Sequence, residues 1–128
     1  MELSAALTGL PGVNSVLHPS RADHRDHSRA AQVVGDRPGN MMSFEVAGGR
    51  KAANALTRAA PDLPFAPTLG DVGTTLSHPA SSSHRALTEQ GRAALGISEG
   101  FFRVSVGLED PALLIAELTD AIAQSQKT

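Results

Sequence analysis

Stretches in which apolar residues recur at every second position predict the strands of this chain. In MMSFEV, Met42, Phe44 and Val46 fall on one side of such a strand. In FFRVSV, apolar residues alternate around Arg103 until Gly107, where the strand is expected to end. The candidate strands are residues 13–17, 41–46, 65–70, 74–77 and 101–106.

Apolar residues spaced three and four positions apart predict the helices. Leu118 and Ile122 belong to the clearest of these patterns, near the carboxyl end. Asp110 is suited to cap the free amides of that helix, and Pro111 suits its first position. The candidate helices are residues 1–10, a segment after residue 20 that ends near Val34, and residues 50–60, 88–95 and 111–123.

About four short strands that alternate with four or five helices indicate the α/β or α+β class. We expect a two-layer arrangement, with a small, mainly antiparallel sheet and the amphipathic helices on one of its faces. The sequence contains no internal repeat. Residues 1–128 are therefore expected to form a single domain that is long enough to bury a core.

Arg103 is the first candidate for a functional residue. It lies in the middle of an otherwise apolar strand, where a charge is costly unless an anion pairs with it. The planar guanidinium group is well suited to a carboxylate. Two alternatives remain open from the residues alone: a solvated position on an edge strand, and a structural ion pair.

Composition excludes several classes of function. The formal net charge is -2, without a basic block, and the only aromatic residues are four phenylalanines, so nucleic acid is not an expected partner. The absence of cysteine excludes disulfides, thiolate catalysis and cysteine-bound zinc, and it fits a reducing compartment. No apolar run has the length of a membrane span, and the amino terminus does not resemble a signal peptide, so we expect a cytoplasmic protein.

Three local patterns suggest other kinds of site, but none of them is complete. His24 and His27 are three residues apart, but no third zinc ligand in register is evident, and exposed turn histidines are the preferred interpretation. The serine- and histidine-rich segment 78–85 lacks the nucleophile elbow of a hydrolase. Gly48 and Gly49 precede a helix without the spacing of a nucleotide-binding loop.

Three segments, taken in order, resemble a known enzyme family. They are MMSFEV, PTLGDVGTTLSHPASSSH and GRAALGISEGFFRVSVGLED, and the earlier VLHPSRADHRDHSRA agrees with them. The resemblance runs from Leu3 to about Ile122. It is to the carboxy-terminal part of the Cys/Met metabolism family of pyridoxal-phosphate (PLP) enzymes, which includes cystathionine γ-synthases, cystathionine lyases, methionine γ-lyases and homoserine-ester sulfhydrylases.

The resemblance implies a substrate site. Arg103 occupies the position of the family's arginine, which holds the substrate α-carboxylate in a bidentate pair. Thr68, Leu69 and Gly70 match the family's S-L-G segment on the substrate side of the cofactor, with threonine in place of the usual serine. We therefore expect Arg103, Thr68 and Leu69 to contact a sulfur-containing amino acid or an O-acylhomoserine in a complete enzyme.

The resemblance also implies what this chain lacks. In the family, PLP is bound to a lysine, with an aspartate at its ring nitrogen and a tyrosine stacked on the ring, all in a larger preceding domain. The chain has no tyrosine, and its lysines, Lys51 and Lys127, do not lie in family-like settings. We expect no catalytic, cofactor-binding or metal-binding residue in this chain, and no activity of the chain alone.

Two functional hypotheses follow. In the first, the chain is the substrate-domain portion of a PLP-dependent trans-sulfuration or γ-elimination enzyme, and the large PLP-binding domain is absent. In the second, it is a catalytically inactive remnant or assembly module that pairs with a full-length relative. A large-domain partner or a homo-oligomer is expected under either hypothesis.

Overall fold

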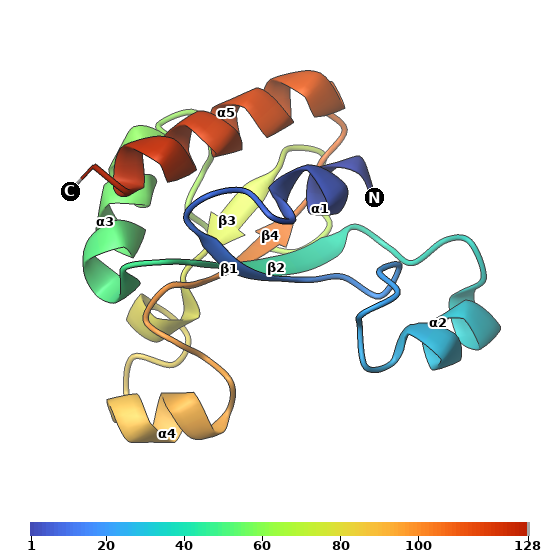
Figure 1. Ribbon diagram of the computed structural model, residues 1–128, viewed down its shortest axis with the longest axis horizontal. Helices are drawn as coiled ribbons and strands as arrows, with labels where there is room; N and C mark the ends of the chain where they lie inside the picture. Colours follow the sequence, from blue (N-terminus) through green and yellow to red (C-terminus); the bar gives the residue numbers. More distant parts are fainter. Residues whose placement is uncertain (128) are drawn as a thin grey trace.

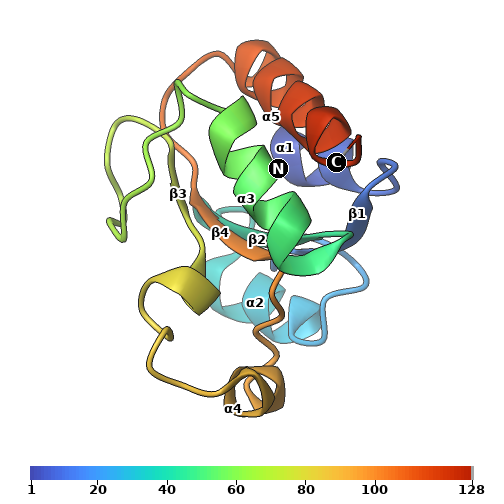
Figure 2. The same ribbon diagram turned by 90° about the vertical axis from the view of Figure 1, so that its left-hand side faces the viewer.

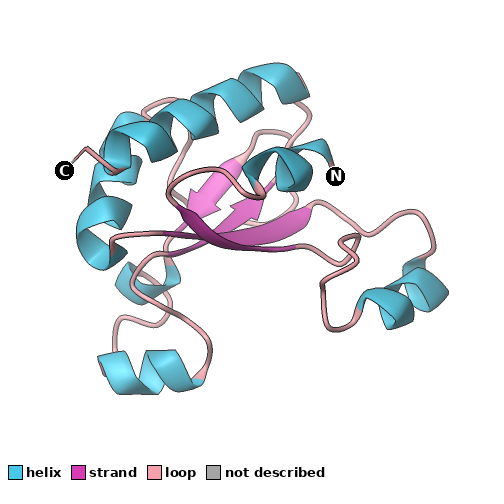
Figure 3. Ribbon diagram, in the orientation of Figure 1, coloured by secondary structure: helices cyan, strands magenta, loops and turns pink. Residues whose placement is uncertain are grey.

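A four-stranded antiparallel sheet forms the centre of the molecule (Figures 1 and 3). The computed structural model describes residues 1–127. The strands are β1 (Val13–Leu17), β2 (Met41–Val46), β3 (Thr75–Ser77) and β4 (Phe101–Ser105). Their order across the sheet is β1-β2-β4-β3, and each neighbouring pair is antiparallel. The two most regular strands in the sequence, β2 and β4, therefore lie side by side in its middle.

Helices cover one face of this sheet. The helical segments are α1 (Glu2–Leu7), α2 (His27–Val34), α3 (Gly49–Ala59), the short 3₁₀ turn η1 (Pro79–Ser81), α4 (Glu89–Ala94) and α5 (Pro111–Ser125). Figures 1 and 2 show α1, α3 and α5 stacked over the same face, whereas α2 and α4 lie beyond the sheet on its other side. Helix α2 buries none of its residues. The expected two-layer α/β arrangement is confirmed, with α2 and α4 outside the helical layer.

The core lies between the sheet and these three helices. Phe44 of β2 and Phe102 of β4 are fully buried, and their rings stack with centroids 5.4 Å apart. Leu56 of α3 and Leu118 of α5 are also fully buried and belong to the same cluster. Burial alternates strictly along β2, in agreement with the alternation of its sequence. This apolar layer fixes which side chains of β2 and β4 point away from the helices.

Two helix starts have the predicted caps. The Asp110 carboxylate accepts a hydrogen bond from the Ala112 amide at 2.8 Å. The Thr88 hydroxyl accepts one from the Gly91 amide at 3.1 Å. Within residues 1–127, the longest helix is α5, and no helix is both long and apolar enough to cross a membrane.

The prediction of a strand at 65–70 is wrong. In this segment only Phe65 makes a β-bridge, to Leu76, and the bridge is parallel. Pro64 and Pro67 flank that bridge, and neither has the N–H group that a continuing ladder requires. The segment therefore runs beside β3 as a loop, which carries Thr68 and Leu69.

Gly100, at the start of β4, offers a test of the sheet's packing. A Cβ atom at Gly100 would lie 2.2 Å from the Val46 carbonyl oxygen, and the same strands are joined by a hydrogen bond from the Val46 amide to the Gly100 carbonyl. We expect Gly100→Ala to lower the free energy of unfolding by about 1–3 kcal/mol, because backbone atoms must move apart. Urea denaturation measures this change. Gly73→Ala is the matched control, since the nearest atom to its Cβ is 4.0 Å away; equal stability of the two variants would contradict the prediction.

Candidate functional site

Arg103 lies on the face of the sheet opposite the helical layer. Its neighbours in β4, Phe102 and Val104, are fully buried in the core, so Arg103 points to the other side. The strand register places Ser43 of β2 and Ser77 of β3 directly opposite Arg103. Cross-strand partners share a face. Arg103 is therefore flanked by Ser43 on one side and Ser77 on the other.

Neither alternative left open by the sequence describes Arg103. β4 is an inner strand, not an edge strand. Arg103 forms no ion pair or hydrogen bond through its side chain with any residue from 1 to 127. The side chain is half-buried and borders a depression of about 300 Å³. The other residues that line this depression are Leu17, His18, Pro19, His24, Met41, Met42 and Ser43.

Thr68 and Gly70 are attached to the same face of the sheet. The Thr68 hydroxyl donates to the Thr75 hydroxyl, and the Thr75 hydroxyl approaches the Thr68 carbonyl oxygen, both at 3.4 Å. The Gly70 amide donates to the Ser105 hydroxyl at 3.0 Å. Thr75 and Ser105 are cross-strand partners, which accounts for the position of this segment.

These contacts bring the predicted site residues near one another. Ser105 is two residues after Arg103 in β4, and alternate residues of a strand are about 6.5–7 Å apart on one face. Because Gly70 is bound to Ser105, the segment that contains Thr68 is held at about this distance from Arg103. Leu69 is 61% exposed and faces solvent. Ser105 belongs to no motif of the sequence that marked it as functional, although its spacing of two residues from Arg103 places it on the same face of the strand.

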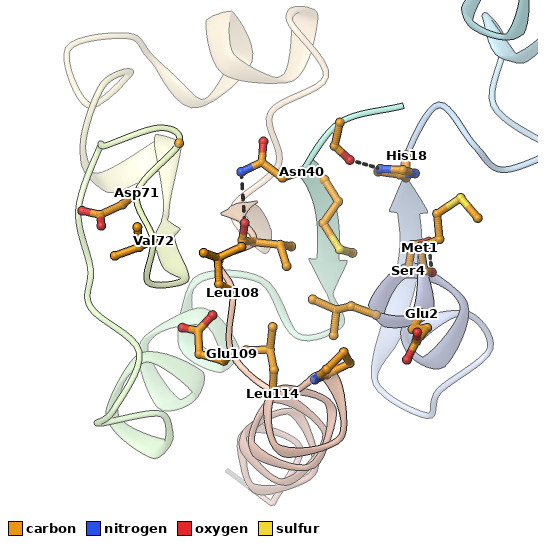
Figure 4. A pocket seen from close by; sticks show the side chains of 17 residues that line it. Met1, Glu2, Ser4, His18, Asn40, Asp71, Val72, Leu108, Glu109 and Leu114 are labelled. Carbon is orange, nitrogen blue, oxygen red and sulfur yellow. Dashed lines mark hydrogen bonds between the residues drawn. The ribbon is translucent and has the colours of Figure 1, made fainter. Parts of the chain in front are cut away.

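A larger pocket of about 490 Å³ lies next to this site, between α1, the loop at 70–72 and the start of α5 (Figure 4). Asp71 and Glu109 lie on one side of it, and Glu2 lies on the other. No arginine or lysine lines it within the described chain. A carboxylate ligand would be repelled by these side chains, so the Arg103 face is the better candidate for an acidic ligand.

The start of β4 is fixed by an ion cluster. Glu99 accepts hydrogen bonds from Arg50 of α3 at 2.5 Å and from Arg92 of α4 at 2.5 and 3.1 Å. These bonds, in the order Arg50 then Arg92, hold the pKa of Glu99 below its usual value. The cluster ties α4 and the loop after it to α3. Arg50 and Arg92 thus have an ionic partner, whereas Arg103 has none among residues 1–127.

His78 adds a second link at the same place. Its Nε2 lies 2.9 Å from the Glu99 carbonyl oxygen, and its Nδ1 lies 2.7 Å from the Ser81 hydroxyl. A ring with a proton on Nε2 can donate to this carbonyl and accept from Ser81. Burial lowers the pKa of His78. His78 thus has a structural role, and the Glu99 side chain beside it is engaged by the arginines, which does not favour the Ser/His hydrolase interpretation.

The lysines do not supply a PLP-binding group at the Arg103 face. Lys51 is exposed on α3, and Lys127 directly follows α5, so both belong to the helical layer (Figure 1). Arg103 lies on the opposite face of the sheet. The described residues therefore do not fit a lysine-bound cofactor next to the candidate site. Among residues 1–127, no group of three or more His, Asp or Glu side chains could hold a metal ion.

Comparisons with known proteins agree on one family. The model of the Cys/Met metabolism PLP-dependent enzymes matches residues 1–123. L-methionine gamma-lyase of Pseudomonas putida is 37% identical over 123 residues, which are 96% of this chain and 31% of that protein. O-succinylhomoserine sulfhydrylase of Pseudomonas aeruginosa is 35% identical over 96% of this chain and 30% of its own length. The chain thus spans just under a third of these relatives.

A solved structure has the same fold. Cystathionine gamma synthase from Xanthomonas oryzae pv. oryzae, determined in complex with cystathionine, superimposes with a TM-score of 0.86 and 37% identity. The superposition covers 99% of this chain and 34% of the other.

The buried histidines predict an acid-sensitive fold. Burial lowers the pKa of both His78 and His18 from 6.5, so near that pH the unfolded chain binds protons that the folded chain does not. Stability should be full above pH 6.5 and should fall as the pH drops toward the folded pKa, by up to about 1.4 kcal/mol per pH unit for each histidine. Urea titrations between about pH 8 and 5 measure this slope.

His78→Gln should make the slope shallower, because one of the two histidines no longer contributes. Glu117 has a raised pKa, caused first by burial and then by Asp62, and it acts in the opposite direction. The decisive quantity is therefore the difference in slope between the wild type and the variant. Identical slopes would show that His78 takes no part.

Proposed function

The chain belongs to the Cys/Met metabolism family of PLP-dependent enzymes, and we propose that it forms the substrate-binding, carboxy-terminal portion of such an enzyme, with Arg103 as the ligand of the substrate α-carboxylate. One observation carries the proposal: a half-buried guanidinium group on an inner strand, without an ionic partner among residues 1–127. A half-buried charge of this kind is stabilised when an anion binds to it.

The substrate class is an α-amino acid with a sulfur or acyl-ester side chain. The relatives are named for L-methionine and O-succinylhomoserine, and the solved structure contains cystathionine. All three compounds carry an α-carboxylate next to an α-amino group and differ in the side chain. A bidentate arginine binds the part that they share. The segment Thr68–Gly70, beside Arg103, is then suited to contact the part that differs.

The contribution of this chain to catalysis is binding and orientation. Arg103 fixes the carboxylate and thereby the position of the α-carbon, whose other substituents can turn only about the bond to the carboxyl carbon. When bound, PLP supplies an electron sink for the carbanion chemistry of the family. The remaining two thirds of a complete enzyme would supply the cofactor lysine, either within a longer chain or as a partner. The chain alone is then a binding domain without turnover.

A binding measurement tests the role of Arg103. We expect L-methionine to shift the side-chain Nε–Hε resonance of Arg103 in NMR spectra, whereas 3-(methylthio)propylamine, which lacks the carboxylate, should not. Arg103→Gln should weaken binding roughly 10- to 100-fold, since charged hydrogen bonds are each worth about 1.5–3 kcal/mol. The affinity of Arg103→Lys should lie between those of the wild type and Arg103→Gln, because lysine keeps the charge and loses the planar fork. Equal shifts with both ligands, or unchanged affinity in Arg103→Gln, would reject the proposal.

A second measurement tests the absence of turnover. PLP added to the purified chain is expected to support no cleavage of L-methionine, even if it forms an adduct with an exposed lysine, because Lys51 and Lys127 lie away from the Arg103 face. Borohydride reduction followed by mass spectrometry detects any lysine adduct. Turnover that is lost in Lys51→Arg would contradict the expectation.

A further inference from the structure

The segment from Ser105 to Glu109 holds one loop through several of its residues, including Leu108, whose amide donates to the Val72 carbonyl oxygen at 2.8 Å. Ser105, Gly107 and Glu109 all contact the loop at residues 68–74, whereas Val104 is buried in the core. The loop has little regular structure of its own and lies exposed at Leu69. Its position therefore depends on the hydrogen bonds that it makes to this segment.

Ser105 holds the part of the loop nearest to Arg103. It is 1% exposed, and its hydroxyl oxygen accepts from the Gly70 amide at 3.0 Å and from the Asn40 side-chain amide at 3.4 Å. Asn40 also donates to the Val106 carbonyl at 3.0 Å, so it is itself fixed to the strand (Figure 4). The Ser105 hydroxyl is thus a buried acceptor for groups that come from two other segments.

The far end of the loop is held by different groups. Thr74 donates to Glu109 through its amide at 2.6 Å and through its hydroxyl at 2.8 Å, and its hydroxyl accepts from the Gly107 amide at 2.8 Å. A Cβ atom at Gly107 would lie 2.4 Å from the Val72 carbonyl oxygen, so the two segments pack backbone against backbone. This anchoring is independent of Ser105.

From these contacts we infer that Ser105 is a positioning residue, whose hydroxyl holds the Gly70 amide and thereby keeps Thr68–Gly70 beside Arg103. The inference rests on the proposed carboxylate site and assigns to it a residue that does not itself contact the substrate. Ser105 and Arg103 lie on one rigid strand, so the hydrogen bond from Gly70 to Ser105 keeps the loop in a fixed position relative to Arg103. When this bond is absent, Thr74 stays anchored and Thr68 keeps only its long contacts with Thr75, both at 3.4 Å, so Gly70 loses the hydrogen bond that holds it to β4.

Hydrogen exchange of single amides tests the inference in the intact chain. In Ser105→Ala, the Gly70 amide loses its acceptor, and its exchange should accelerate about tenfold or more. The Phe44 and Phe102 amides in the inner strands should keep their rates. Ser105→Thr restores the hydroxyl and should restore protection at Gly70. Ser43→Ala is the matched control for exchange at Gly70, because the Ser43 hydroxyl lies beside Arg103 without a hydrogen bond to the described residues.

Ligand binding by the same variants separates the two proposals. Ser105→Ala should bind L-methionine about three- to tenfold more weakly with Arg103 intact, and Ser105→Thr should recover the affinity. If Gly70 exchange is unchanged, or if affinity is unchanged although protection is lost, the positioning role is overturned and the role of Arg103 stands. If Arg103→Gln binds as the wild type does, the proposed function fails, whatever the exchange data show. If Ser105→Ala does not fold, Ser105→Cys replaces it, since cysteine keeps the shape of the serine side chain and its sulfur is a weaker acceptor.

Discussion

The inner position of β4 in the sheet is the constraint on which the rest of the structure depends. Pairing with β2 on one side and β3 on the other fixes the register of β4 and sends alternate side chains to opposite faces. Phe102 and Val104 enter the core beneath the helices, and Phe102 stacks on Phe44. A shift of one residue would exchange these side chains with Arg103 and Ser105. The hydrophobic core therefore also determines the face on which the candidate site is built.

Arg103 and the two arginines of the Glu99 cluster have different environments. Arg50 and Arg92 are bound by Glu99 and connect three segments of the structure. Arg103, in contrast, has only serines opposite it and no ionic partner in the described part of the chain. A structural arginine is satisfied within the fold, whereas one that binds a ligand must remain available to it. This contrast is the main physical reason to propose Arg103 as a carboxylate ligand.

The contacts of the loop at 68–74 explain how a site can be shared between distant segments. Residues about 35 positions apart meet because hydroxyl, carboxylate and backbone groups of β4 and the segment after it satisfy the loop's polar groups. Prolines prevent this segment from forming a regular strand ladder, so its polar groups form hydrogen bonds with hydroxyl oxygens and with Glu109 instead. For Glu109, burial would raise the pKa, but the hydrogen bonds from Thr74 and from the amide of Glu109 itself together outweigh it and lower the pKa.

The sequence by itself determined the class of fold and four of the strands, because periodic apolar patterns and capping residues act over short distances. Its motifs, taken in order, also resembled those of the family. It also identified Arg103, since a lone charge in an apolar strand is costly. Local patterns failed at 65–70, where apolar residues indicated a strand that the prolines prevent. Only the tertiary structure decided that Arg103 lies on an inner strand between Ser43 and Ser77, and that Ser105 binds Gly70. Those relations depend on strand order and on contacts between distant segments, which no local pattern encodes.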